Sequence, residues 1–91
     1  MASYHYTLKT YSAEGSISIE GTVRLPLASV ALEEFLSEVS RKVGEDLDPA
    51  STGQSNYLIL INEMRVDWER DRKMLLSEGD RLTWITPPFG G

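Results

Sequence analysis

The residues best placed to do chemistry stand at the end of the sequence, in the segment Pro87-Pro88-Phe89-Gly90-Gly91. Glycine has no Cβ, so Gly90 and Gly91 could pass through a channel too narrow for other residues. The chemical handle that remains there is the α-carboxylate of Gly91. Pro87 and Pro88 lack N–H donors and cannot continue a sheet ladder, so five extended residues would reach about 17 Å from the body. We expect a flexible tail over 87–91 that presents a carboxylate to a partner's active site. The alternative is that these residues are simply a frayed chain end without a function.

Side chains that could catalyse a reaction are few. His5 is the single histidine, and nothing beside it in sequence would orient it for catalysis, which favours a structural role. Asp67, Glu69 and Asp71 form an acidic run, but a cation site needs more convergent oxygen ligands, so a solvated charged face is the better interpretation. The absence of cysteine excludes disulfides, thiolate metal sites and a cysteine nucleophile. We predict no catalytic residue, no bound metal and no bound cofactor in this chain.

Composition and charge narrow the choice of partners. The 91 residues are enough for one domain, and the net charge is −5, from 9 Lys and Arg against 14 Asp and Glu. An acidic domain is repelled by phosphate backbones, so we expect no nucleic-acid partner. A partner steered by charge would carry a basic surface, unless the charge serves solubility alone. No stretch reaches the ~18 apolar residues of a membrane span and residues 1–5 do not begin a secretory signal, so we expect a cytoplasmic protein without a membrane partner.

The first quarter of the chain predicts a β-hairpin. Residues 4–11 are aromatic and β-branched with alternating character, and residues 16–25 alternate between apolar and polar positions. The apolar positions of the second strand are Ile17, Ile19, Val23 and Leu25. Gly21 falls on the same parity, which predicts a bulge or a close approach by the helix.

A helix follows over residues 29–43. Apolar residues recur there at helical spacing, Ser29 can cap the first turn, and Gly44 is a suitable stop. Residues 45–56 are polar and rich in turn formers, which predicts a loop. Residues 57–61 form a continuous apolar run, the pattern of a strand covered on both faces or lying at a buried sheet centre.

The remaining elements are short. We expect a turn, a short return strand, a helical turn, a tight turn and a final strand at residues 62–63, 64–66, 67–73, 77–80 and 81–86. A hairpin, a helix and further strands in this order predict an α+β domain, a β-grasp fold with one main helix on one face of a mixed sheet of four to five strands. The first and last strands would be parallel neighbours at the sheet centre. The domain would span residues 1–86 and the tail 87–91.

The second half of the chain resembles the MoaD/ThiS family of ubiquitin-like sulfur carriers. The resemblance rests on three segments in order, Ile61-Asn62-Glu63, Leu76-Ser77-Glu78-Gly79-Asp80-Arg81-Leu82 and Pro87-Pro88-Phe89-Gly90-Gly91. The two prolines are closer to MoaD, the small subunit of molybdopterin synthase, than to ThiS, the thiamine sulfur carrier. Glu63 stands where the family has glycine in its Asn-Gly turn, which predicts a different turn geometry because Glu tolerates a positive φ poorly.

This resemblance implies a function for the tail. An adenylating enzyme of the MoeB/ThiF type would use ATP and Mg²⁺ to activate the Gly91 carboxylate, and a sulfur donor would convert it to a thiocarboxylate, while Gly90 permits passage. The MoaD likeness implies a larger catalytic subunit of the MoaE type and a role in molybdenum cofactor biosynthesis. Conjugation of Gly91 to other proteins and sulfur transfer for thiamine, cysteine or tRNA thiolation remain open alternatives. A plain β-grasp interaction module, in which Gly90 and Gly91 are incidental, is a third alternative.

Aromatic residues and prolines near the tail are the candidates for partner contact. Phe89 has no core to enter from an extended segment, which predicts that it docks on a partner beside Pro87 and Pro88. Trp84 lies in the final strand, where a core position and an exposed interface position are equally compatible with the sequence.

Overall fold

A computed structural model describes residues 2–12, 14–44, 47 and 57–86 of the chain. Strands β1 (Ala2–Ser12) and β2 (Gly15–Leu25) form a long antiparallel hairpin, and β3 (Ser29–Ala31) leads directly into helix α1 (Leu32–Val43). The remaining elements are β4 (Leu58–Ile61), β5 (Met64–Val66), α3 (Trp68–Asp71), β6 (Leu75–Ser77) and β7 (Arg81–Thr86).

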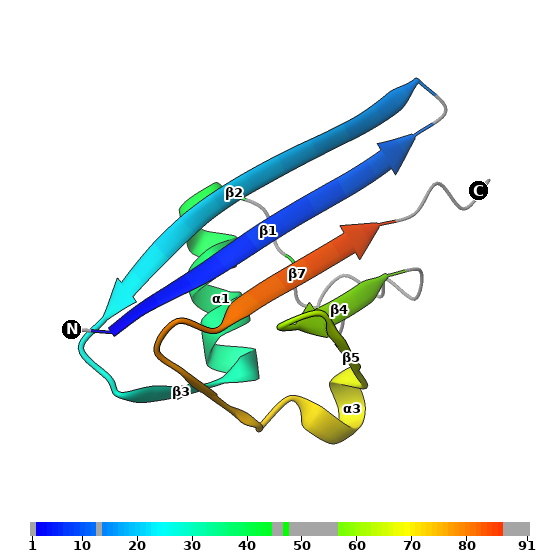
Figure 1. Cartoon of the computed structure of the whole chain (residues 1–91). Helices are drawn as coiled ribbons and strands as arrows, with labels where there is room; N and C mark the ends of the chain where they lie inside the picture. Colours follow the sequence, from blue (N-terminus) through cyan, green and yellow to red (C-terminus); the bar gives the residue numbers. More distant parts are fainter. Residues whose placement is uncertain (1, 13, 45–46, 48–56, 87–91) are drawn as a thin grey trace.

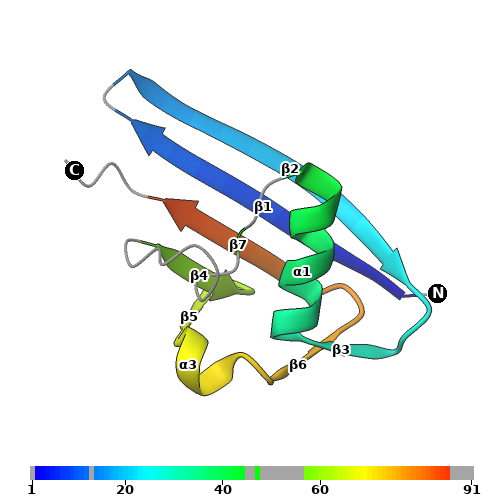
Figure 2. The same cartoon turned by 180° about the vertical axis from the view of Figure 1, so that it is seen from behind.

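The strands form one main sheet and one small sheet. The main sheet has the order β2-β1-β7-β4-β5, and β3 pairs with β6 in the small one. β1 and β7 are parallel, whereas the other neighbouring strands are antiparallel. Helix α1 crosses one face of the main sheet (Figure 2). This is the predicted β-grasp fold, with the first and last strands side by side at its centre.

The core lies between the sheet and α1. Register places Tyr6 beside Leu82 on the neighbouring strands, and the alternating parity of the strands turns both side chains toward the helix. From the helix, Leu32, Phe35, Leu36 and Val39 are buried against them. The ring of Phe35 packs against that of Tyr4 with centroids 5.6 Å apart. The predicted periodicity of the helix therefore builds the core, whereas of the four apolar positions predicted on the second strand only Val23 is buried, Leu25 is half-buried, and Ile17 and Ile19 are exposed.

The start of the helix differs from the prediction. The helix begins at Leu32 rather than at residue 29, its N-cap is Ala31, and Ser29 does not cap it because it pairs with Ser77 in the small sheet. The N–H groups of Leu32 and Glu33 instead donate to the carbonyls of residues 74 and 72, both at 2.8 Å. Backbone carbonyls from a distant segment thus satisfy donors that a side-chain cap would otherwise serve.

Two further expectations require correction. Gly21 is approached by the ring of Tyr6, its register partner on β1, rather than by the helix, and the continuous register shows no bulge there. β4 lies inside the sheet between β7 and β5, yet only one of its faces is covered. Ile59 and Ile61 are buried, whereas the other two residues are half-buried on the face without a helix. Of the two alternatives for the apolar run, the place inside the sheet is confirmed, whereas in the described part of the chain a helix lies on one face only.

Candidate functional site

Strand β7 positions the segment in which the sequence placed the reactive terminus. It lies at the centre of the sheet and is paired on both sides, with β1 through the pair Thr10 and Thr86 and with β4 through the pair Leu58 and Ile85 (Figure 1). The pairing continues to the last residue before the predicted tail. The predicted site residues Pro87, Pro88, Phe89, Gly90 and Gly91 lie outside the described residues.

The two motif turns that precede β7 contact each other. The side-chain N–H of Asn62 donates to Asp80 Oδ1 at 3.0 Å, and Asn62 Oδ1 accepts from the backbone N–H of Arg81 at 3.0 Å. The backbone N–H of Asn62 also donates to the Arg81 carbonyl at 2.9 Å. Asp80 Oδ2 in turn accepts from the N–H of Ser77 at 2.8 Å. Residues that the sequence showed only as separate motifs thus form one network at the start of β7, which sequence spacing alone did not reveal.

The turn at Asn62-Glu63 does not have the different geometry that the sequence predicted. Both residues have positive φ values, 52° for Asn62 and 70° for Glu63. These are the values that a two-residue type I′ hairpin turn requires, so the turn has the geometry of an Asn-Gly turn although Glu63 replaces the glycine. The hydrogen bonds of Asn62 to the β7 start hold the hairpin in this geometry despite the poor tolerance of Glu for positive φ.

Trp84 belongs mainly to the core. It is 9% exposed and lies between Leu8 and Ile59 in the register of the central strands. Its indole also forms part of the wall of an open cavity of about 240 Å³, whose other lining residues are Leu8, Thr10, Ile17, Ile19 and Leu47. The indole N–H of Trp84 is buried and has no hydrogen-bond partner among the described residues. Of the two alternatives left by the sequence, the structure therefore favours a core position, with one edge of the side chain beside a cavity.

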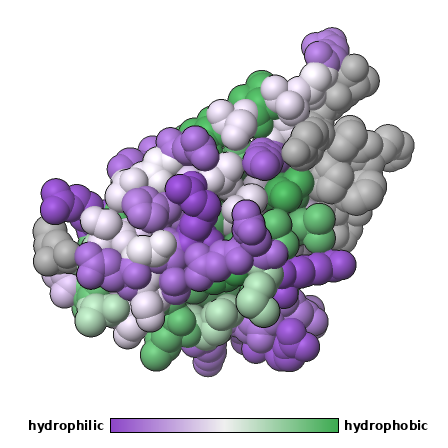
Figure 3. All heavy atoms as spheres, in the orientation of Figure 1, coloured by the Kyte–Doolittle hydropathy of each residue, from purple (hydrophilic) through white to green (hydrophobic). Residues whose placement is uncertain are grey.

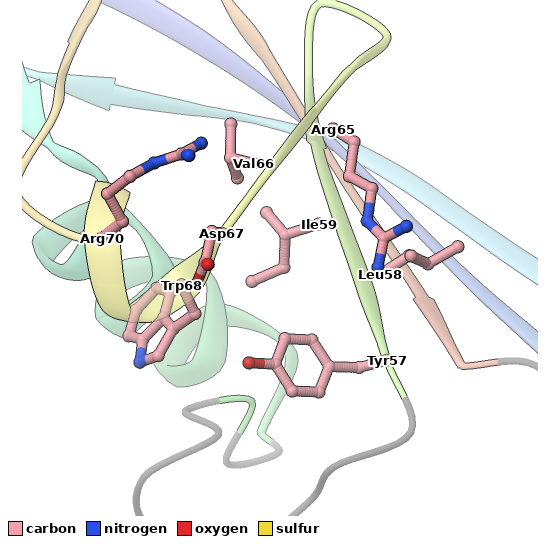
Figure 4. Close-up of a pocket in the computed structure, with 8 residues that line it drawn as sticks. All are labelled: Tyr57, Leu58, Ile59, Arg65, Val66, Asp67, Trp68 and Arg70. Atoms are coloured by element: carbon pink, nitrogen blue, oxygen red, sulfur yellow. The ribbon is translucent and has the colours of Figure 1, made fainter.

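A second cavity, of about 440 Å³, lies between the β4–β5 hairpin and α3 (Figure 4). Tyr57 and Trp68 line it together with the side chain of Arg65. Arg70, also in the lining, is bound to Asp71 by hydrogen bonds of 3.0 and 3.1 Å. The sequence did not predict this cavity, because its walls come from a strand edge and a one-turn helix whose packing is a tertiary property.

The acidic run is accounted for by local structure. Asp67 caps α3 by accepting from the N–H of Glu69 at 3.1 Å, and Asp71 accepts from the N–H of Asp67 at 3.0 Å. The hydrogen bond from Arg70 lowers the pKa of Asp71, and the same contact raises the pKa of Arg70. Within the described part of the chain, no group of three or more His, Asp or Glu side chains could hold a metal ion.

His5 lies on the face of the sheet without a helix. Its Nδ1 is 3.1 Å from the hydroxyl of Thr22 on the neighbouring strand. Its backbone N–H donates to the carbonyl of Asp80 at 3.0 Å. These contacts describe a residue that links strands.

Charge is distributed unevenly over the molecule. The face of the main sheet opposite α1, here called the open face, carries one basic side chain on each of four strands, namely Lys9, Arg24, Arg65 and Arg81. Glu20 on the same face lies 3.7 Å from Arg81, which also donates to the hydroxyl of Thr7 at 2.8 Å. Figure 3 shows this face, where hydrophilic side chains cover most of the area beside smaller hydrophobic regions. The net charge predicted a partner with a basic surface, but such a surface would not complement this face, because the face itself carries basic side chains.

In the described part of the chain, the sheet order, the parallel central pair and helix α1 on one face define a β-grasp domain of the ubiquitin-like type. No family model matches the sequence. An uncharacterized protein of Archaeoglobus fulgidus is 33% identical over 61 residues, and the match covers 67% of this chain but 58% of that protein, so the chain spans little more than half the length of this relative. The solution structure of Urm1 from Trypanosoma brucei is similar with a TM-score of 0.45 at 21% identity, covering 96% of this chain and 95% of that one. Among the described residues, no helix is long and apolar enough to cross a membrane.

Proposed function

We propose that this chain is a ubiquitin-like sulfur carrier whose C-terminal Gly91 carboxylate is converted to a thiocarboxylate. We also propose that the protein is cytoplasmic and that it has no catalytic residues of its own. It also names two partners, an adenylating enzyme of the MoeB/ThiF type and an acceptor subunit of the MoaE type, and favours molybdenum cofactor biosynthesis as the pathway. Conjugation to other proteins is the alternative that the same terminus would serve.

The observation that carries the proposal is the contact among the motif segments. Asn62 and Asp80 are 18 residues apart in sequence, yet their side chains are joined by a hydrogen bond of 3.0 Å at the start of β7. The resemblance to the carrier family was drawn from these residues in order along the chain. A direct contact gives the spacing a physical reason, because it sets the register of the strand that leads to residue 87.

The chemistry needs little from the carrier itself. In the first step an oxygen of the Gly91 carboxylate attacks the α-phosphate of ATP, and pyrophosphate leaves. In the second step the sulfur of sulfide (HS⁻) attacks the acyl carbon, the C–O bond to AMP breaks so that AMP leaves, and loss of the proton gives a thiocarboxylate. The activating enzyme would supply Mg²⁺ and the catalytic groups, and ATP bound there is a substrate of that enzyme rather than a cofactor of this chain. The carrier contributes a narrow segment anchored to a rigid strand.

Intact mass spectrometry tests the proposal directly. We would incubate the protein with a MoeB/ThiF-type enzyme, Mg-ATP and a sulfur donor, and expect a mass gain equal to the replacement of one oxygen by sulfur. Deletion of Gly91 should abolish the gain, whereas Leu75→Lys, a change on the exposed surface of β6, should not. The proposal requires Gly91 to be the last residue of the mature protein. The intact mass of the protein before incubation tests this requirement.

The same experiment separates the alternatives. Unchanged mass with an enzyme that is active on its own carrier would refute carriage of sulfur by Gly91. Covalent adducts with other proteins in cell extracts, lost on deletion of Gly91, would show a protein modifier instead. Activity of reconstituted molybdopterin synthase with the sulfur-loaded chain would test the pathway and the MoaE-type partner, and Phe89→Ala should weaken binding to either partner if Phe89 docks with Pro87 and Pro88.

A further inference from the structure

Among the residues that the structure describes, no strand pairs with the outer edge of β2, so β2 leaves one long edge of the main sheet open. In an antiparallel pair, alternate residues direct their backbone N–H and C=O groups away from the partner strand. Thr22 is one of these residues, since its carbonyl accepts from Lys42 Nζ at 2.7 Å and its register partner His5 donates its N–H toward β7. By the two-residue period of a strand, the backbone groups of Ser16, Ser18 and Glu20 also face outward.

The outer part of this edge lacks the protection that sheet edges usually have. Natural edges are shortened, covered, or guarded by lysine and proline. The opposite edge, β5, has three residues, and on β2 the ammonium group of Lys42 covers the carbonyl of Thr22. Every residue from Gly15 to Glu20 is exposed, and the segment 16–20 contains no lysine and no proline. We call this segment the open edge.

Two large apolar side chains stand beside the open edge. Ile17 is 66% exposed and Ile19 is 48% exposed. Both have the parity of Val23, so they lie on the helix side of the sheet, but the hairpin extends past the end of α1 and the helix does not reach them (Figures 1 and 2). The open edge therefore offers backbone hydrogen bonds and apolar surface together, which is what an added β-strand would use.

We propose that a second copy of this chain pairs with the open edge, antiparallel and about a two-fold axis at Ser18. The open edge is five residues long and centred on Ser18, so symmetric pairing places Ser16 opposite Glu20 of the partner subunit. Residues with outward backbone groups then face each other, as an antiparallel ladder requires. The two five-stranded sheets join into one continuous sheet.

This register is also self-complementary in its side chains. Ile17 comes opposite Ile19 of the partner subunit, and the two-fold axis creates the same pair again, so the four isoleucines form one apolar cluster. A slip by two residues in either direction would place one isoleucine of each subunit opposite Gly15 or Gly21 of the partner subunit, so the contacts between isoleucines favour this register.

The expected dimer is weak and leaves β7 free. Five paired residues and two isoleucines per subunit bury less than the roughly 1,200 Å² of a stable interface, so association depends on concentration. β1 lies between β2 and β7 in the sheet, so the pairing does not use the strand that precedes residue 87. The proposal is therefore independent of the proposed function.

Sedimentation equilibrium of the full chain between about 10 µM and about 1 mM, the affinity range of weak interfaces, tests the proposal. We expect a monomer–dimer equilibrium. Ile17→Lys should raise the dissociation constant at least about tenfold, because it places two like charges in the apolar cluster. Leu75→Lys is the matched control, since Leu75 is also 66% exposed but lies on β6 in the small sheet, and it should leave the constant unchanged.

A charge exchange tests the register. Ile17→Lys and Ile19→Glu should each weaken the dimer, and the double variant should recover it because these two positions face each other in the proposed register, while the urea midpoint of each variant shows that the fold persists. The Ser18 amide should exchange more slowly as protein concentration rises. A monomer throughout the range, a dimer that survives Ile17→Lys, association beyond a dimer, or a strand of a different protein bound at residues 16–20 of a monomeric chain would each overturn the proposal.

Discussion

The contact between Gly21 and Tyr6 makes a sharp prediction about the substitution Gly21→Ala. Gly21 and Tyr6 are register partners on β2 and β1, and a Cβ built on Gly21 would overlap the hydroxyl and ring carbons of Tyr6. The ring has little room to retreat, because Tyr6 is 4% exposed and Leu82, fully buried, lies on its other side. One added methyl group must therefore displace an aromatic side chain within the core.

The magnitude follows from two opposing effects. Overpacking of a well-filled core costs about 1–3 kcal/mol. Replacing glycine by alanine in a strand recovers about 0.5–1 kcal/mol of backbone conformational entropy. The net loss of unfolding free energy for Gly21→Ala is then about 1–2 kcal/mol, which for a domain of this size lowers the melting temperature by about 4–8 °C for each kcal/mol.

Urea unfolding of Gly21→Ala, Tyr6→Leu and the double variant measures this coupling. Tyr6→Leu removes the ring that Gly21 accommodates, so Gly21→Ala should be neutral or stabilising by about 0.5–1 kcal/mol in that background. A coupling free energy of about 1–3 kcal/mol between the two positions is expected. An equal cost of Gly21→Ala in both backgrounds, or no cost in the parent, would refute the account of the contact.

Three further predictions concern hydrogen bonds. Tyr4→Phe should lose about 1 kcal/mol of stability, because the buried hydroxyl donates to the carbonyl of Leu27 at 2.9 Å. Burial raises the pKa of Tyr4, so the advantage over the Phe variant should be full below pH ~10 and decline as pH rises through the raised pKa in urea titrations. Asn62→Ala should cost about 1–3 kcal/mol by urea unfolding, since the side chain both donates and accepts at the start of β7; an unchanged midpoint would contradict this. Asp71→Asn should lower the urea midpoint at pH 7, and this loss should disappear as pH falls below about 3.9 through the lowered pKa of Asp71. Glu69→Gln is the control, because it removes a charge from the same helical turn and leaves the contact between Arg70 and Asp71 in place.

The parts of the fold that follow from local periodicity could be predicted from the sequence. Alternating apolar residues on the second strand, and helical spacing up to the stop at Gly44, match the elements found over 15–25 and 32–43. The order of elements and the parallel central pair then follow from packing one helix on a sheet. The strand and the helix depend on residues that are close in sequence, whereas the central pair joins distant segments and could be predicted only from the order of the elements.

The parts that depend on distant segments could not be predicted. Ser29 has the residue type of a helix cap, and the competing choice, pairing with Ser77, becomes visible only when β6 is placed beside it. The parity of Trp84 does not show whether its face of the sheet is covered or open. The position of α1 decides which face is covered. Glu63 adopts a positive φ that its type disfavours, because Asn62 is held by residues 18 and 19 positions further along the chain.

The hydrogen bonds between Asn62 and Arg81 matter because they fix the register of β7 against its neighbouring strands. A slip by one residue would turn Trp84 from the core to the open face and move the end of β7 at Thr86 by about 3.3 Å along the sheet. Burial of Trp84 opposes odd slips, but a slip by two residues would keep its parity and is not opposed by the apolar pattern. The backbone and side-chain bonds of Asn62 to Arg81 exist in one register only. A carrier whose terminus must reach the active sites of two enzymes would need that register to be fixed, and an asparagine in the preceding hairpin provides the bonds that fix it.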